Sequence, residues 1–334
     1  MIFVTGGNGL VGSHILLKLS QQGRAFKALR RSSSSLEVCK RIFTYYNAAD
    51  LFSKIHWVIG DINDMQTLEA GFKDCDMILH CAALVSFAPS DLDRLKKINI
   101  EGTANIVNLA LSQNIKKLGY ISSIATLGSN STKNIIDEEC YFKSSNLVSH
   151  YAISKYYAEQ EVWRGVAEGL DAVIINPSVI LGPGDWKKGS SQIFQKIYNG
   201  LNYYTSGSTG YVDVDDVAEA LLQLMFSNIN NERFIVNAAN LKYRDCFDKI
   251  AVNLKKPKAT IKVTPFIKEI AWRIEAIRSF FSGKKPLLTK ETANMAMKNR
   301  KFSSAKIEKV INFKFTEINS TIKKYSDWFI ADLI

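Results

Sequence analysis

The chain has 334 residues, of which 46% are hydrophobic and 22% are charged, and its formal net charge is +11 at pH 7. This length can bury a large core in one domain or two joined lobes, and the composition is ordinary for a soluble globular protein. The basic residues are scattered and are not interleaved with aromatic ones, which favours an anionic cofactor or substrate over nucleic-acid binding.

Two further features narrow the class of protein. The five cysteines form no Cys-x-x-Cys pair, which favours reduced thiols in a cytoplasmic protein over disulfides or a zinc site, so no metal site is expected. The sequence has no run of about 20 uncharged apolar residues, so we expect no membrane-spanning helix. Because the first predicted strand begins at residue 1, we also expect no signal peptide.

The first predicted element is a glycine-rich loop that binds a nucleotide. Met1–Val4 is an apolar run of strand length, and the TGGNGLVGS sequence over residues 5–13 leads into a helical pattern. A glycine pattern between a strand and a helix is the context in which a pyrophosphate binds. Gly6 and Gly9 would allow a sharp turn and close approach of the backbone, and Gly12 would let the helix pack tightly on the strand.

The second predicted strand indicates which dinucleotide is bound. Sites that prefer NAD place a carboxylate at the end of this strand, where it binds the ribose 2′-hydroxyl. Here Ala25–Leu29 leads into Arg30 and Arg31 and then into serines, with no carboxylate. Guanidinium groups and hydroxyls suit a 2′-phosphate, so NADP(H) is favoured and NAD(H) remains an alternative. The other interpretation is that both arginines are solvated loop residues.

Strand-like and helical patterns alternate over the first 240 residues. Further apolar runs of strand length are Ile55–Ile59, Met77–Cys81, Leu118–Ser122, Ala172–Asn176 and Phe234–Asn237, and amphipathic segments cover residues 10–22, 91–113, 149–169 and 214–227. This alternation predicts βαβ crossovers and a doubly wound, mostly parallel sheet with helices on both faces. After residue 240, helical patterns predict a smaller, mainly helical lobe.

One helical pattern in that lobe has two interpretations. Residues 266–281 carry Ile267, Ile270, Ile274, Ile277 and Phe281 on one face, and basic residues flank this stripe. The favoured interpretation is a helix that buries the stripe on the protein's own core. The alternative is a helix that lies on a membrane surface.

Two pairs of residues are typical of a proton-transfer site. Tyr151 and Lys155 are four positions apart at the start of a predicted helix, so their side chains share one face. An ammonium group near a phenol lowers the phenol's pKa from its ordinary value of about 10 toward the working range. Ser122 and Ser123 end a predicted strand, where ligands bind in open α/β sheets. Alone, these serines could equally cap or turn the backbone.

In this order, the motifs resemble the extended short-chain dehydrogenase/reductases, also called the NAD-dependent epimerase/dehydratase family. The resemblance covers nearly the whole chain. Further matches are Gly60-Asp61-Ile62, His80-Cys81-Ala82-Ala83, Asn99-x-x-Gly102-Thr103, Asn176–Pro183 and Tyr211–Ala218. It implies a Rossmann domain over residues 1–175 and 205–237, and a substrate-binding lobe over residues 176–204 and 238–334.

The resemblance also implies roles for individual residues. Tyr151 would be the acid/base, Lys155 would lower its pKa and hold the nicotinamide ribose, and Ser123 rather than Ser122 would bond the reacting oxygen. Asp61 and Ile62 would contact the adenine. The complete cofactor-binding set is expected to be Thr5, Gly6, Gly9, Leu10, Val11, Gly12, Arg30, Arg31, Asp61, Ile62, Cys81, Ala82, Ala83, Asn99, Ser122, Tyr151, Lys155, Pro177, Ser178 and Val179.

One difference from the family's nucleotide-sugar enzymes narrows the class of substrate. Nucleotide-sugar enzymes usually carry Arg-Asp where this chain has Thr209-Gly210. The sequence around 283–289 and 302–306 instead resembles the dihydroflavonol-reductase and 3β-hydroxysteroid-dehydrogenase-like branch. We therefore expect an NADP(H)-dependent enzyme that interconverts a small-molecule ketone or aldehyde and an alcohol. The alternatives are a nucleotide-sugar 4-epimerase or dehydratase with tightly bound NAD, and a non-catalytic NADP-sensing regulator. A homodimer is also compatible with the family.

Overall fold

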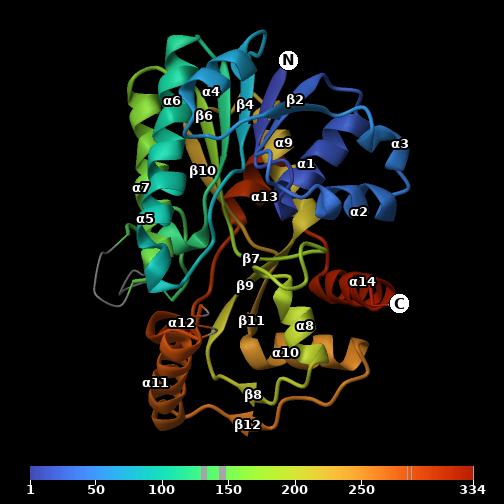
Figure 1. The fold of residues 1–334 in the computed structure, drawn as a ribbon, viewed down its shortest axis with the longest axis vertical. Coiled ribbons are helices and arrows are strands. Elements are labelled where there is room, and N and C mark those ends of the chain that lie inside the picture. The colour runs from blue at the N-terminus through green and yellow to red at the C-terminus, as the bar shows by residue number, and fades with distance from the viewer. Residues whose placement is uncertain (129–133, 143–147, 284, 287, 334) are drawn as a thin grey trace.

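A computed structural model describes residues 1–128, 134–142, 148–283, 285–286 and 288–333. The seven predicted strand runs all pair in one parallel sheet, which confirms the predicted doubly wound fold (Figure 1). Its strands are β1 (Ile2–Thr5), β2 (Phe26–Arg30), β3 (His56–Ile59), β4 (Met77–His80), β5 (Lys117–Ile121), β6 (Ala172–Pro177) and β10 (Glu232–Val236). The strand order is β10-β6-β5-β4-β1-β2-β3. Successive strands are therefore added toward one edge from β1 to β3 and toward the other edge from β4 onward, so the switch point lies between β1 and β4. In such sheets, the ligand crevice lies at the carboxyl ends of the strands that flank this point.

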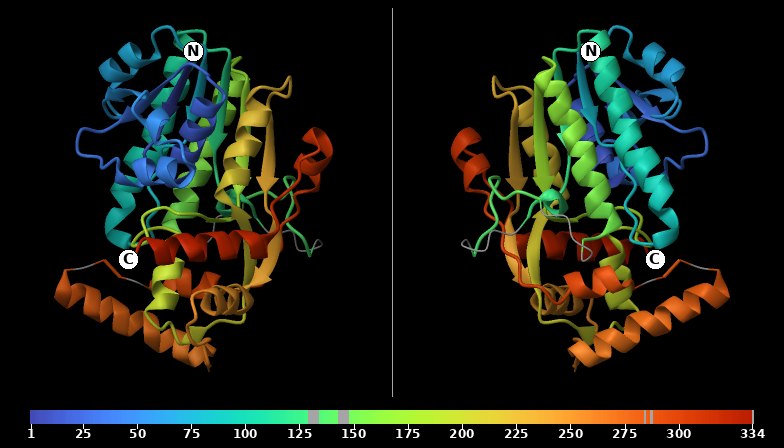
Figure 2. Two further views of the ribbon diagram at one scale, coloured as in Figure 1. Left: turned by 90° about the vertical axis from the view of Figure 1, so that its right-hand side faces the viewer. Right: turned by 90° about the vertical axis from the view of Figure 1, so that its left-hand side faces the viewer.

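Helices cover both faces of the sheet and form two separate cores (Figures 1 and 2). One face packs against α1 (Leu10–Gln21), α2 (Glu37–Tyr45), α3 (Ala49–Phe52), α9 (Val214–Met225) and α13 (Ala305–Ile311). The other packs against α4 (Met65–Phe72), α6 (Gly102–Ser112) and α7 (His150–Ala167). Because both faces are covered, the strands read as nearly continuous apolar runs in the sequence.

The helix expected over residues 91–113 is divided into several segments. After a 3-10 turn, η1 (Pro89–Asp91), the chain forms α5 (Leu92–Leu95), a π-helical turn, η2 (Lys96–Glu101), and then α6. A further 3-10 turn, η3 (Ile124–Thr126), follows β5. π-Helical turns are rare and occur frequently at functional sites. This one contains the buried Asn99.

The rest of the chain forms a lower part with its own core. Three strands, β7 (Val179–Leu181), β9 (Ser208–Asp213) and β11 (Ala239–Lys242), form one small sheet, and β8 (Tyr203–Tyr204) pairs with β12 (Ile261–Lys262). The helices are α8 (Gln192–Tyr198), α10 (Tyr243–Asn253), α11 (Pro265–Ser282), α12 (Lys290–Met295) and α14 (Ile318–Ala331). These strands of two to six residues were not predicted, because such short runs carry little periodic signal.

The favoured interpretation of residues 266–281 is wrong. They form α11 as expected, but no residue of this helix is buried. Phe266, Ile270, Ile274, Ile277, Phe280 and Phe281 are exposed instead of packing on a core. Among the described residues, no helix is both long and apolar enough to cross a bilayer.

Candidate active site

The glycine loop forms a tight turn in which two positions exclude any side chain. Gly6 has φ of +67°, and a Cβ atom there would lie 2.6 Å from the backbone nitrogen of Ala82. A Cβ atom on Gly12 would lie 2.1 Å from the carbonyl oxygen of Gly6. Helix α1 begins directly after Gly9, which has no side chain to cap the first N–H groups. The loop therefore offers backbone donors and a close approach, as a pyrophosphate site requires.

A buried network fixes the ends of β1 and β4 beside this loop. His80 Nδ1 lies 2.6 Å from Thr5 Oγ1, and His80 Nε2 lies 3.0 Å from Thr103 Oγ1. Thr5 Oγ1 also accepts a hydrogen bond from the Ala82 N–H at 3.2 Å. Burial, with a smaller effect of Lys155, lowers the pKa of His80 to about 3, so the ring is neutral near pH 7. Thr5 is thereby assigned to shaping the loop.

Ser123 and Tyr151 are brought together at the carboxyl end of the sheet. Ser123 follows β5, and Tyr151 lies in the first turn of α7, which Ser149 caps by accepting a hydrogen bond from the Ala152 N–H at 3.2 Å. The nearby Ser123 hydroxyl offsets part of the rise that burial causes in the pKa of Tyr151, and Ser123 Oγ accepts a hydrogen bond from the Ala125 N–H at 3.1 Å. Both side chains are only partly buried. Neither residue is therefore fully enclosed by the core.

Phe87 supplies an apolar wall for this pair. Its ring packs edge-on against the ring of Tyr151, with centroids 5.5 Å apart. Edge-to-face packing of this kind fixes the orientation of the phenol. Three other aromatic residues lie away from this pair: Trp186 is buried in the lower core, and Tyr203 and Tyr204 form β8.

Lys155 lies deeper than the pair and contacts β5. It is 1% exposed, and its Nζ atom donates to Tyr120 OH at 2.7 Å and to the Ile121 carbonyl at 2.8 Å. Burial lowers the pKa of Lys155 to about 7, and the nearby carboxylate of Glu159 partly opposes this effect. A lysine with such a pKa changes charge within the working range of pH.

The pKa of Tyr151 differs from the expectation. Burial raises this pKa above its ordinary value, and the bond to Ser123 only partly offsets the rise. The expected lowering by Lys155 requires the ammonium to stabilise the phenolate, but the recorded bonds of that ammonium go to Tyr120 and Ile121. In this arrangement the tyrosine is a neutral acid that holds its proton, which is the form needed for protonating a substrate.

A buried carboxylate that we did not predict organises the region beneath the pair. Glu159 Oε2 accepts hydrogen bonds from Ser122 Oγ at 2.5 Å, Thr126 Oγ1 at 2.9 Å and Asn176 Nδ2 at 2.9 Å. Its other oxygen forms an ion pair with Arg233 Nη1 at 3.1 Å. The signal was present in the sequence, because Glu159 lies four residues after Lys155 on the same face of α7. The hydroxyl of Ser122 is thus engaged with the protein interior.

Asn99 links the end of β4 to α7. Its amide exchanges hydrogen bonds with both backbone groups of Leu84, at 2.7 and 3.0 Å, and donates to Ser154 Oγ at 2.9 Å. These bonds fix the segment from Cys81 to Leu84 beside the helix that carries Tyr151. These contacts give Asn99 a positioning role. Burial raises the pKa of the Cys81 thiol to about 12, so this thiol is unreactive near pH 7.

The remaining predicted cofactor residues lie at or after the carboxyl ends of the same strands. Arg30 ends β2, with a buried Nε atom that has no partner, and Arg31 is exposed. Ser178 follows β6, and its buried hydroxyl is also unpartnered. Others are Leu10 and Val11 at the start of α1, Asp61 and Ile62 after β3, Ala83 after β4, Pro177 at the end of β6 and Val179 at the start of β7. Unpartnered buried polar atoms and the glycine cradle fit an extended dinucleotide.

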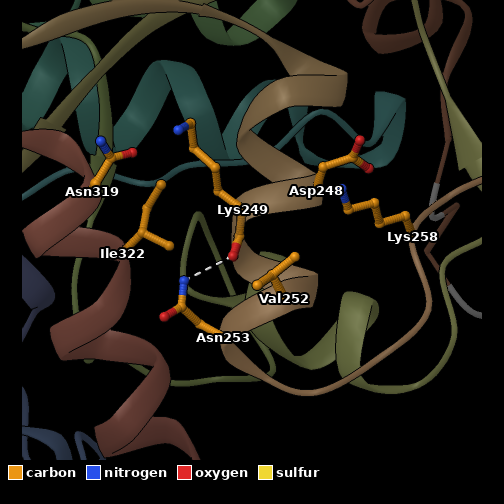
Figure 3. A pocket seen from close by; sticks show the side chains of 7 residues that line it. All are labelled: Asp248, Lys249, Val252, Asn253, Lys258, Asn319 and Ile322. Carbon is orange, nitrogen blue, oxygen red and sulfur yellow. Dashed lines mark hydrogen bonds between the residues drawn. The ribbon is translucent and has the colours of Figure 1, made fainter.

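A depression of about 290 Å³ lies apart from these residues. It is formed by α10, the segment after it and α14 (Figure 3). Its lining residues are Asp248, Lys249, Val252, Asn253, Lys258, Asn319 and Ile322, none of which belongs to the predicted site. The candidate site therefore rests on the strand ends and on the contacts of Ser123, Tyr151 and Lys155.

Comparison with known proteins identifies the family. A family model described as "NAD dependent epimerase/dehydratase family" matches residues 2–239. The chain belongs to this family. It is therefore an NAD(P)-dependent enzyme, either a reductase or an epimerase, in agreement with the order of motifs in the sequence.

Individual relatives include reductases and an epimerase. A Synechocystis sp. protein named "Putative dihydroflavonol 4-reductase" is 27% identical over 98% of this chain and 94% of its own. Cinnamoyl-CoA reductase 1 of Petunia hybrida is 26% identical over 67% of this chain and 68% of its own. Among solved structures, UDP-glucose 4-epimerase of Thermotoga maritima with UDP-glucose matches with a TM-score of 0.79 at 20% identity, over 100% of this chain and 99% of that one. At that identity the last match shows the fold alone.

Proposed function

We propose that the protein is an NADP(H)-dependent oxidoreductase that interconverts a ketone or aldehyde and an alcohol. The observation that carries this proposal is that Ser123 and Tyr151, both only partly buried, lie near each other at the carboxyl end of the sheet, with Lys155 buried on the same helix as Tyr151. The reductase names of the relatives in Synechocystis and Petunia also support it. We further propose residues 176–204 and 238–334 as the substrate-binding lobe.

The chemistry divides between the cofactor and the chain. A bound nicotinamide supplies a hydride to the carbonyl carbon. Ser123 donates a hydrogen bond to the carbonyl oxygen and polarises it. Tyr151 gives its proton to the same oxygen as negative charge develops there, which completes the alcohol. Proton donation leaves a phenolate on Tyr151, and in the reverse direction this phenolate takes the hydroxyl proton. Lys155 bonds Tyr120 and the Ile121 carbonyl beneath the pair, and Asn99 and Glu159 hold the surrounding segments in position.

The preference for NADP(H) rests on the end of β2. Arg30 and Arg31 place two guanidinium groups where an NAD-preferring site has a carboxylate, and a 2′-phosphate would satisfy the unpartnered Nε atom of Arg30. A thermal-shift titration with NADPH and NADH tests this assignment. We expect saturation at a lower concentration of NADPH, and an Arg31→Ala variant that loses the preference. Lys54→Ala, which removes an exposed cation elsewhere, should keep it. Equal affinities in the wild type would contradict the assignment.

The carbonyl substrate is supported by burial at the positions where nucleotide-sugar enzymes carry Arg-Asp. Thr209 is buried within β9, and a Cβ atom on Gly210 would lie 2.1 Å from Asn237 Oδ1. Neither residue offers a cation for a diphosphate. A panel of aldehydes and ketones with NADPH, followed by nicotinamide absorbance, tests the reaction. Turnover of a carbonyl is expected. Co-purifying NAD together with conversion of a UDP-sugar in the absence of any carbonyl would instead establish the alternative, a nucleotide-sugar 4-epimerase.

A further inference from the structure

Helix α11 carries the most exposed aromatic side chains in the lower part of the molecule. Phe280 and Phe281 are each 83% exposed, and Phe266 is 74% exposed. Figure 2 shows the helix at the outer edge of the lower part, projecting away from the seven-stranded sheet. Each of these side chains leaves a large apolar area in water, which is unfavourable by an amount proportional to that area.

The exposed residues form one continuous stripe. Phe266, Ile270, Ile274, Ile277 and Phe281 are spaced by four, four, three and four positions, which places them on a single face of an α-helix. All five are exposed. The opposite face contacts the protein, where Lys268 Nζ donates to Asn294 Oδ1 at 2.7 Å. The helix thus turns this apolar stripe outward, whereas a normal surface helix turns its apolar stripe toward the core.

One ion pair and one contact between a carboxylate and a histidine attach residues that follow α11 to the body of the protein. Lys285 Nζ lies 2.5 Å from Asp91 Oδ2, and Glu291 Oε1 lies 3.8 Å from His150 Nε2 at the start of α7. The stripe is therefore presented by a helix with fixed attachments at its end, and not by a free tail.

The charge around the stripe is strongly basic. Between residues 255 and 290 the sequence contains ten lysines and arginines and two glutamates, which is a net charge of +8 out of +11 for the whole chain. Arg273 and Arg278 lie on either side of the stripe by helical position, and each forms an ion pair with a glutamate of the same helix, so most of the excess positive charge lies in the segments that flank the helix. A second copy of the chain docked on this face would bring two such segments together and repel it. A surface that carries negative charge and covers an apolar interior complements both the apolar stripe and the basic residues near it.

We propose that α11 binds the surface of an anionic lipid bilayer, with its phenylalanines and isoleucines among the upper acyl chains and its flanking basic residues at the headgroups. An amphipathic helix with Phe and Ile on one face and Lys or Arg beside it has the features of an interfacial helix. The energy comes from buried apolar area together with attraction to anionic lipid. This binding is a property of α11 and does not depend on the proposed reaction.

Sedimentation with lipid vesicles tests the proposal on the full chain. Wild-type protein should pellet with vesicles of phosphatidylcholine and phosphatidylglycerol, pellet much less with phosphatidylcholine alone, and lose binding as salt screens the charges. Phe280→Gln/Phe281→Gln should weaken partitioning by about tenfold or more, because two exposed rings no longer insert. Val252→Gln/Val310→Gln removes exposed apolar side chains from α10 and α13 and should bind as wild type.

Three results would overturn the proposal. The first is wild-type protein that stays in the supernatant with the anionic vesicles, and the second is equal binding by Phe280→Gln/Phe281→Gln. The third is a wild-type dimer in analytical ultracentrifugation that this double variant converts to monomer, because the stripe would then serve a second copy. Circular dichroism confirms that each variant is folded. Since both rings are almost fully exposed, their replacement leaves the core unchanged.

Discussion

Replacement of Lys155 by methionine should change how the protein's stability depends on pH. Burial lowers the pKa of this lysine from 10.5 to about 7. Between these two values, the unfolded chain binds a proton that the folded protein has released. The free energy of unfolding of the wild type therefore rises with pH through this window and is flat, for this group, below it. The slope approaches about 1.4 kcal/mol per pH unit, so going from about pH 7 to about pH 9 adds about 2 kcal/mol.

Urea denaturation at several pH values between about 6 and about 9 measures this effect. Lys155→Met has no proton to release, so the wild type should gain about 2 kcal/mol relative to this variant between about pH 7 and about pH 9. Lys188→Met is the matched control, because the Lys188 side chain is 82% exposed, and its curve should run parallel to that of the wild type. Parallel curves for the wild type and Lys155→Met would refute the reasoning, since Lys155 would then titrate as an ordinary lysine.

Two further variants test the parts of the site that support the reacting groups. Gly12→Ala places a Cβ atom 2.1 Å from the Gly6 carbonyl oxygen and should weaken dinucleotide binding in a thermal-shift titration by about tenfold or more. In Gly9→Ala the corresponding distance is 3.3 Å, so the loss of affinity should be smaller. Equal affinities in the two variants would contradict this geometry. Glu159→Gln leaves the Arg233 guanidinium without its buried counter-charge and should lower the free energy of unfolding by about 3 kcal/mol in urea denaturation. A loss below about 0.5 kcal/mol would show that the network contributes little to stability.

The main sheet could be predicted well because each of its strands is a compact apolar run. The runs from Met1–Val4 to Phe234–Asn237 all became strands of the parallel sheet, with ends shifted by one or two residues. The order of the strands was not contained in these runs, because pairing joins residues that are distant in the sequence. The short strands β8 and β12 were missed for a different reason: a strand of two residues is too short to show a periodic pattern.

In the candidate site, the residue types were easier to predict than their bonds. The sequence indicated Ser123, Tyr151 and Lys155, and in the structure Ser123 lies near enough to Tyr151 to affect its pKa. It could not show that the Lys155 ammonium bonds Tyr120, 35 positions away, because that bond depends on how α7 packs on β5. The stripe of α11 shows the same limit: periodicity identifies an apolar face, but the tertiary arrangement decides whether the protein or the solvent lies opposite it.

The most direct test of the proposed chemistry is the turnover of Tyr151→Phe with NADPH and a carbonyl substrate identified from the panel. Loss of the proton donor should lower kcat by about 10²- to 10⁴-fold. Binding of NADPH in the thermal-shift assay should persist, because the ring and its contact with Phe87 remain. Tyr157→Phe removes the hydroxyl of an exposed tyrosine on the same helix and should keep full activity. A Tyr151→Phe enzyme with wild-type kcat would contradict the account.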